Sequence, residues 1–263
     1  MEAIKALSLG KLTLGGKSVA LVAPNGSGKT SNCIAPAILY FLTCFPRGQV
    51  PVTSSSWMQV EKQLFPALRR YMDNPFFDGW TFNKTEIRTP EGGFAVGFST
   101  DNAGRAEGWH PKISPDVDPV FYVLDEAKTI PDSIFTAVSR CTLFHAFITS
   151  SPGADSGTFY DCFHKNSSLY YKIRVKYEDC PHIEINDPGK AERLKKEYGE
   201  QSSFYRSAIL GEFTDLDGQS VIPRRALMDL VNNPPPFLDT GETCGGFDFA
   251  AGGDENVFAA GKG

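Results

Sequence analysis

A glycine-rich loop followed by lysine and threonine is the strongest chemical pattern in the sequence. It follows a short apolar run at residues 18–22, and a helix with an apolar face is expected from about Gly28. Backbone N–H groups of such a tightly curled loop can surround phosphate oxygens, and the helix N-terminus adds favourable partial charge. The residues expected to contact phosphates are Ala23, Pro24, Asn25, Gly26, Ser27, Gly28, Lys29, Thr30 and Ser31.

Lys29 and Thr30 have the side chains best suited to a nucleoside triphosphate. Lys29 would reach the β- and γ-phosphates, and the Thr30 hydroxyl would bind Mg²⁺. The loop departs from the usual pattern only at its first position, where Ala23 stands in place of glycine. An ordinary glycine-rich turn before a helix is the alternative interpretation.

Two adjacent carboxylates end a second apolar run. Residues 120–124 are fully apolar, and Asp125 and Glu126 follow them directly. Ligands bind at the carboxyl ends of strands in open α/β sheets. We therefore expect Asp125 to hold Mg²⁺ and Glu126 to orient or deprotonate the attacking water, so that ATP and Mg²⁺ are the cofactors of a hydrolase. A solvated acidic turn is the alternative.

Three hydroxyl side chains, Thr149, Ser150 and Ser151, follow the next expected strand at residues 146–149. They could sense the γ-phosphate and pass its loss to a moving element. They could equally cap a helix, since hydroxyl side chains are common at that position.

Hydrolysis also benefits from an arginine that neutralises charge on the transferred phosphoryl group. Arg105 is our first candidate because it lies in a glycine-containing loop shortly before the apolar run that ends in Asp125 and Glu126. Arg69, Arg70 and Arg140 are rivals, and a surface salt bridge is the alternative role for any of them.

The elements that must position these residues alternate along the chain. Strands are expected at residues 18–22, 50–52, 94–98, 120–124 and 146–149, with helices at 57–71, 132–140, 191–198 and 203–210. This alternation predicts an α/β fold with a mostly parallel central sheet flanked by helices.

Composition narrows the class of protein. The chain has 263 residues, 41% of them hydrophobic, which suits one main globular domain, and no apolar stretch is long enough for a membrane span. We therefore expect a cytoplasmic protein. A net charge of −5 argues against a protein whose whole surface binds nucleic acid. The six cysteines are expected to be reduced, and a zinc site made by Cys162, His164, Cys180 and His182 is a weaker alternative.

Taken together, these motifs resemble the large terminase subunit of tailed bacteriophages, a P-loop NTPase of the ASCE type. The resemblance spans nearly the whole chain and includes two further runs, one at residues 198–203 and a more specific one that ends in Gly211, Glu212 and Phe213. It implies an ATPase domain at residues 1–215, a linker at 216–241, and at 242–263 the truncated beginning of an RNase H-like nuclease domain. Asp248 would be a metal ligand of that incomplete nuclease site, so we expect no DNA cleavage by this chain.

The resemblance also implies a function and partners. The function would be translocation of double-stranded viral DNA into a procapsid in the bacterial host cytoplasm. The partners would be the portal protein, a small terminase subunit and like subunits in a ring. Because the phosphate loop has no arginine, Arg105 is expected to act in a neighbour's site. The alternatives are a helicase-like or remodelling ATPase, and a nucleotide-gated assembly protein that binds ATP without hydrolysing it.

Overall fold

The computed structural model describes residues 18–99, 103–111, 118–142, 145–214, 230, 233, 243–248 and 257–262. The chain divides into two compact units, Met1–Leu216 and Asp217–Gly263. No helix in the described ranges has the length and apolarity needed to cross a membrane.

The first unit is built on a sheet whose described part has eight strands in the order β3-β4-β5-β2-β6-β7-β1-β8. The strands are β1 (Ser18–Val22), β2 (Gln49–Ser54), β3 (Thr81–Asn83), β4 (Glu86–Arg88), β5 (Phe94–Ser99), β6 (Phe121–Asp125), β7 (His145–Ser150) and β8 (Tyr170–Arg174). In this spatial order, the neighbouring strands β5, β2, β6, β7, β1 and β8 pair in parallel. Strands β3 and β4 form an antiparallel hairpin at one edge, next to β5. The mostly parallel sheet is confirmed, and the hairpin is an addition that the sequence pattern did not indicate.

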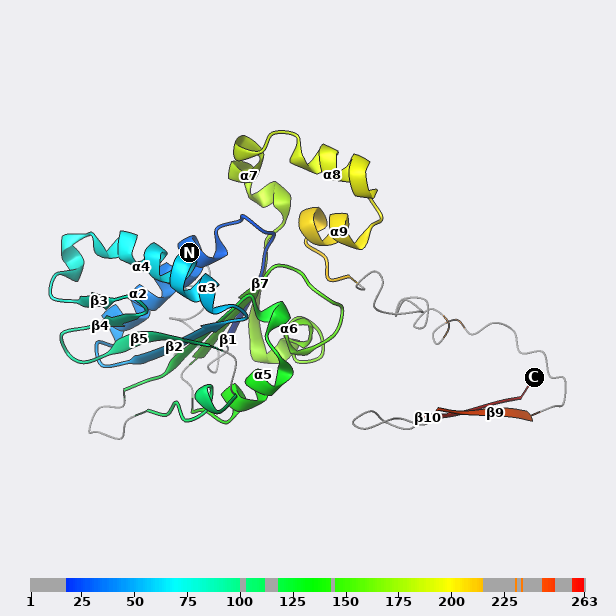
Figure 1. The fold of residues 1–263 in the computed structure, drawn as a ribbon, viewed down its shortest axis with the longest axis horizontal. Helices are drawn as coiled ribbons and strands as arrows, with labels where there is room; N and C mark the ends of the chain where they lie inside the picture. Colours follow the sequence, from blue (N-terminus) through cyan, green and yellow to red (C-terminus); the bar gives the residue numbers. More distant parts are fainter. Residues whose placement is uncertain are drawn as a thin grey trace. The chain divides into compact units, whose positions relative to one another are not determined.

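Helices connect the strands and cover the sheet (Figure 1). Before β6 they are η1 (Lys29–Ile34), α2 (Ala35–Cys44), α3 (Trp57–Gln59), η2 (Val60–Leu64), α4 (Phe65–Met72), η3 (Pro75–Phe77) and η4 (Ala103–Arg105). Between β6 and β8 they are η5 (Ala127–Thr129), α5 (Asp132–Ser139), α6 (Thr158–Asp161) and η6 (Ser167–Leu169). After β8 come η7 (Tyr177–Asp179), α7 (Pro181–Asn186), α8 (Lys190–Tyr198), α9 (Ser203–Tyr205) and η8 (Arg206–Leu210).

The central strands are buried on both faces, which explains their uninterrupted apolar runs. Along β1, Val19 and Leu21 belong to a core cluster with α2 and α4, whereas Ala20 and Val22 belong to a second cluster with α5 and α6. Alternate side chains of a strand point to opposite faces, and β1, β6 and β7 each contribute to both clusters. The phosphate loop and the Asp125–Glu126 pair thus extend from strands whose side chains are almost all buried.

The second unit contains an antiparallel pair of strands, β9 (Thr243–Asp248) and β10 (Val257–Lys262). Asp248, which the resemblance implies as a metal ligand, is the last residue of β9 and pairs with Val257. The expected linker at residues 216–241 lies outside the described residues apart from Leu230 and Asn233.

Candidate nucleotide-binding site

The strand order brings three of the expected motifs to one edge of the sheet. Strand β7 lies between β1 and β6, with Val22 opposite Ser150 and Leu124 opposite Ile148. All three strands run in parallel, so the phosphate loop after β1, the acid pair at the end of β6 and the hydroxyl run at the end of β7 lie side by side. This is the edge at which open α/β sheets bind ligands.

The phosphate loop has the tight curvature that its glycines indicate. Gly26 and Gly28 have φ of 81° and 84°, values that favour glycine, and a Cβ on Gly28 would lie 2.5 Å from Asn32 Nδ2. Ala23 is not among the described residues with positive φ, and its N–H donates to the Ser150 carbonyl at 3.1 Å. The first position therefore needs no glycine here, which accounts for the departure from the usual pattern.

Lys29 is buried in the loop, with only 6% of its surface exposed. Its Nζ donates to the carbonyls of Ala23 and Pro24, each at 3.3 Å, and lies 3.9 Å from Glu126 Oε1. The Ser27 hydroxyl is buried and has no hydrogen-bond partner within the described part of the chain. The loop thus holds a cation and an unused hydroxyl where phosphate oxygens are expected.

The Thr30 hydroxyl and the Asp125 carboxylate form a direct pair. Thr30 Oγ1 donates to Asp125 Oδ2 at 2.9 Å, and the Glu126 N–H donates to Asp125 Oδ1 at the same distance. Burial, and secondarily the charge of Glu126, raises the pKa of Asp125 to about 6 despite these hydrogen bonds. A buried carboxylate next to a hydroxyl is a site that favours a cation.

These two oxygen donors fit Mg²⁺, which prefers oxygen ligands and usually shares them with substrate phosphates and water. In the described ranges, no group of three His, Cys, Asp or Glu side chains is placed to hold a metal ion without such help. Three residues of the alternative zinc site contact backbone carbonyls. Cys162 Sγ donates to the Thr158 carbonyl, and His164 Nδ1 lies 2.9 Å from the Tyr160 carbonyl. His182 Nε2 lies 3.0 Å from the Gly26 carbonyl.

Glu126 is the only non-glycine residue in the described ranges with positive φ, at 51°. Such a backbone conformation costs about 1–3 kcal/mol and persists when its surroundings determine it. It places Oε2 at 3.4 Å from the Ser150 hydroxyl, which donates to it, while Oε1 faces Lys29. Glu126 is thus held beside the phosphate loop from two sides.

The three hydroxyl residues at the end of β7 lie in the interior. Thr149 and Ser150 have no exposed surface and Ser151 has 3%. Ser150 contacts Glu126, and Ser151 Oγ accepts from Lys128 Nζ at 2.7 Å. Thr149 Oγ1 is buried without a hydrogen-bond partner among the described residues. Ser150 and Ser151 therefore both contact the segment that carries Glu126 and begins η5.

A cavity of about 690 Å³ opens over the phosphate loop and Glu126. This volume lies in the range of small-molecule sites, which is roughly 300–1,000 Å³. Asn25, Gly26 and residues 28–31 of the loop line one side. One face of the helical stretch at residues 57–72 lines the other, with Gln59, Lys62, Gln63, Pro66 and Arg70. Apart from Arg70, this face was not predicted, although its spacing of three to four residues is visible in the sequence.

The four candidate arginines differ in their surroundings. Arg70 lines the cavity and Arg69, its neighbour, lies over the Phe82 ring at 5.3 Å. Arg140 forms an ion pair with Glu107 at 2.6 Å. Arg105 is exposed at the end of η4, where its carbonyl accepts from Trp109 Nε1, and it is not among the described residues that line the cavity.

No protein-family model matches the sequence, and no curated protein does either. Solved structures with a similar fold exist. The large terminase from a thermophilic bacteriophage is 13% identical with a TM-score of 0.59, and the match covers 81% of this chain and 53% of that one. The same terminase in complex with ATP-gamma-S matches with 14% identity and a TM-score of 0.57, over 81% of this chain and 52% of that one.

The ATPase domain of the Thermus phage P74-26 large terminase is 16% identical with a TM-score of 0.56, over 76% of this chain and 89% of that one. The chain thus spans about half the length of the thermophilic bacteriophage terminase and most of the Thermus phage ATPase domain. At this level of identity the likeness concerns the fold. The chain has the P-loop NTPase fold of these large terminase ATPase domains.

Proposed function

We propose that this chain hydrolyses ATP and uses the energy to move double-stranded viral DNA into a procapsid, as the motor part of a large terminase subunit. The observation that carries this proposal is the position of Glu126, fixed between Lys29 and Ser150 beside a phosphate loop. A protein that only binds nucleotide has no need for a carboxylate in this place. The fold of the terminase ATPase domains, one of them in complex with ATP-gamma-S, supports the choice of ATP.

Nucleotide binding would exchange the internal contacts of the loop for contacts to phosphate. Lys29 Nζ now donates to two backbone carbonyls at 3.3 Å, and phosphate oxygens are stronger acceptors because they are charged. The N–H groups from Asn25 to Ser31 would surround the phosphates. Thr30 and Asp125 would hold Mg²⁺, which neutralises phosphate charge when bound.

Hydrolysis would begin with a water molecule held by Glu126 in line with the γ-phosphate. The water oxygen would attack the γ-phosphorus while Glu126 accepts a proton from the water. The bond between the γ-phosphorus and the oxygen that joins it to the β-phosphate would then break. Lys29 would stabilise the charge that develops on the phosphates. Arg70 could add a second cation in cis, and Arg105 one from a neighbouring subunit.

The remaining assignments follow from the terminase likeness. Like subunits would form a ring on the portal protein, and a small terminase subunit would deliver the DNA in the cytoplasm of the bacterial host. Residues 1–215 would be the ATPase domain and 216–241 a linker. Residues 242–263 would begin an RNase H-like nuclease domain, with Asp248 as one of its metal ligands.

ATP turnover with and without linear double-stranded DNA tests the proposal. We expect DNA to stimulate phosphate release by the wild-type chain, and Lys29→Ala to abolish both basal and stimulated release because the phosphates lose their cation. Turnover that is equal with and without DNA would contradict the motor function. Stimulation by single-stranded DNA alone would favour the helicase-like alternative.

A further inference from the structure

The loop that follows β7 is held by side chains from two different parts of the unit. On one side, Lys128 Nζ donates to Ser151 Oγ at 2.7 Å and to the Pro152 carbonyl at 3.4 Å. On the other side, Ser207 Oγ of η8 donates to the same Pro152 carbonyl at 3.0 Å. One carbonyl oxygen therefore joins the segment after the acid pair to the helical segment near the end of the unit.

The connection continues to the catalytic carboxylate. Ser150 Oγ donates to Glu126 Oε2 at 3.4 Å and accepts from the Lys128 N–H at 3.3 Å. A Glu126 oxygen that accepts from a water molecule beside the γ-phosphate competes with the already long bond from Ser150. Engagement of Glu126 with that water therefore alters the hydrogen bonds of Ser150, and with them those of the Lys128 backbone.

Lys128 also packs tightly against the loop, so a shift in its position is passed on rather than absorbed. A Cβ placed on Gly153 would lie 2.8 Å from Lys128 Cβ, closer than real side chains approach. The Gly153 carbonyl in turn accepts from the Thr214 N–H at 3.1 Å. Close-packed contacts of this kind transmit displacement because they leave little free volume.

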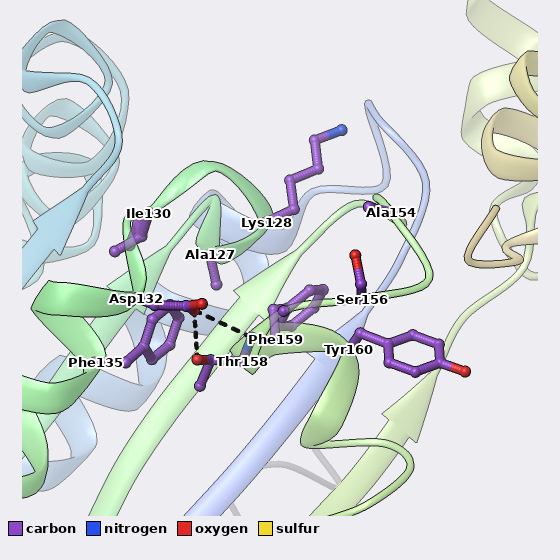
Figure 2. A pocket seen from close by; sticks show the side chains of 11 residues that line it. Ala127, Lys128, Ile130, Asp132, Phe135, Ala154, Ser156, Thr158, Phe159 and Tyr160 are labelled. Carbon is purple, nitrogen blue, oxygen red and sulfur yellow. Dashed lines mark hydrogen bonds between the residues drawn. The ribbon is translucent and has the colours of Figure 1, made fainter. Parts of the chain in front are cut away.

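A second connection runs parallel to the first and ends in the same place. Asp132, at the start of α5, accepts hydrogen bonds from the N–H and the hydroxyl of Thr158 at the start of α6 (Figure 2). The next residue, Phe159, lies 5.6 Å from the Phe213 ring, measured between ring centroids. The Lys128 side chain extends away from the Asp132–Thr158 contact (Figure 2). The segment after the acid pair thus reaches residues 207–214 by two routes.

We propose that Lys128 is a positioning residue that transmits the nucleotide state from Glu126 to residues 203–214 through the Pro152 carbonyl. This inference rests on the proposed ATPase function. It gives the run that ends in Gly211, Glu212 and Phe213 a physical role as the element that receives the signal. A route of contacts becomes a coupling route only when a change at one end alters the other, so the test must measure both ends.

Hydrogen exchange followed by mass spectrometry measures both ends in the full chain. In the wild type, Mg²⁺ and ATP-gamma-S should slow exchange in the phosphate loop and change exchange at residues 203–214. Lys128→Met keeps most of the side-chain length but removes the donor. It should retain the protection of the loop and clearly reduce the change at 203–214, with any remaining change carried by the Asp132–Thr158 connection, while Lys128→Arg should restore the full response.

Two further variants exclude a general loss of structure. Ser207→Ala removes the other donor to the Pro152 carbonyl without touching the Glu126 side, and it should give the same loss at residues 203–214. Lys84→Met removes a surface lysine that pairs with Glu61, and it should behave as wild type.

A wild-type-like response of residues 203–214 in Lys128→Met would overturn the inference. So would loop protection in the wild type without any response at 203–214. Absence of loop protection in the wild type would instead contradict the proposed function, and the inference would fall with it.

Discussion

The two sides of the cavity over the phosphate loop are built in different ways. On the sheet side, Lys29, Asp125 and Ser150 are buried, and each is held by a hydrogen bond of 2.9–3.4 Å to a neighbour. On the helical side, Arg70 and Lys62 are exposed, and in the described ranges Arg70 has no ion pair. Arg105 is also exposed, but it is not among the described residues that line this cavity.

This difference indicates that the sheet side and the helical side of the cavity have different roles. The side chains of the sheet side are already held close together within the chain, so under the proposed function phosphate binding would need only a local exchange of hydrogen bonds such as those of Lys29. Under the proposed function, further cations besides Lys29 would come from exposed side chains such as Arg70 or from another subunit. Substitutions on the two sides should therefore have different effects, and we expect the largest effect at Arg105, the arginine proposed to act from a neighbouring subunit.

Arg105→Ala should lower DNA-stimulated ATP turnover by about 10³–10⁵-fold, the usual effect of removing an arginine finger. If Arg105 acts in trans, mixing Arg105→Ala with Lys29→Ala subunits should restore part of the activity. In the mixture, some interfaces between subunits combine a phosphate loop that keeps Lys29 with a neighbouring subunit that keeps Arg105. No recovery in the mixture, measured as phosphate release, would contradict the trans geometry.

Glu126→Gln should lower the hydrolysis rate by about 10²–10⁴-fold, because the amide cannot accept the proton from water. Nucleotide affinity, measured by titration with a fluorescent ATP analogue, should stay near the wild-type value. Turnover close to wild type would show that another group positions the water.

Arg70→Ala should lower kcat/KM for ATP by about 10- to 100-fold, since a hydrogen bond to a charged group is worth about 1.5–3 kcal/mol. Arg69→Ala is the matched control, because it removes the same charge from the adjacent position, over Phe82 rather than in the cavity. Equal losses in the two variants would assign the effect to general charge rather than to Arg70.

Asp125→Asn should raise the free energy of unfolding of the nucleotide-free protein at about pH 8 and leave it nearly unchanged at about pH 4. The folded-state pKa of Asp125 is raised from 3.8 to about 6. Its stabilising contribution is therefore complete below about pH 4 and is lost as pH rises through about 6, by about 3 kcal/mol at most. Urea denaturation at both pH values measures the difference, and an unchanged stability at the higher pH would contradict it.

The sequence predicted the sheet side well because its information is local. The apolar runs before Ala23 and Asp125 define buried parallel strands, and the glycines at 26 and 28 define the loop. The expected functional side chains Lys29, Thr30, Asp125, Glu126 and Ser150 then meet because carboxyl ends of parallel strands share an edge.

The helical side could not be predicted in the same way. The face with Gln59 and Arg70 has ordinary amphipathic spacing, and only the strand order places it opposite the phosphate loop. Nothing in the sequence around Lys128 indicates its contacts with Ser151 and Pro152, which join residues more than 20 positions apart. The β3–β4 hairpin was missed because its strands have three residues each, too few for a periodic pattern.

Single-turnover hydrolysis of MgATP by the purified chain, without DNA or partner proteins, measures whether the sheet side can hydrolyse ATP by itself. If the sheet side is preorganised, the wild type should hydrolyse bound ATP slowly but measurably, and Glu126→Gln should bind ATP and leave it intact. Hydrolysis that does not exceed the Lys29→Ala background, despite confirmed ATP binding, would contradict the account.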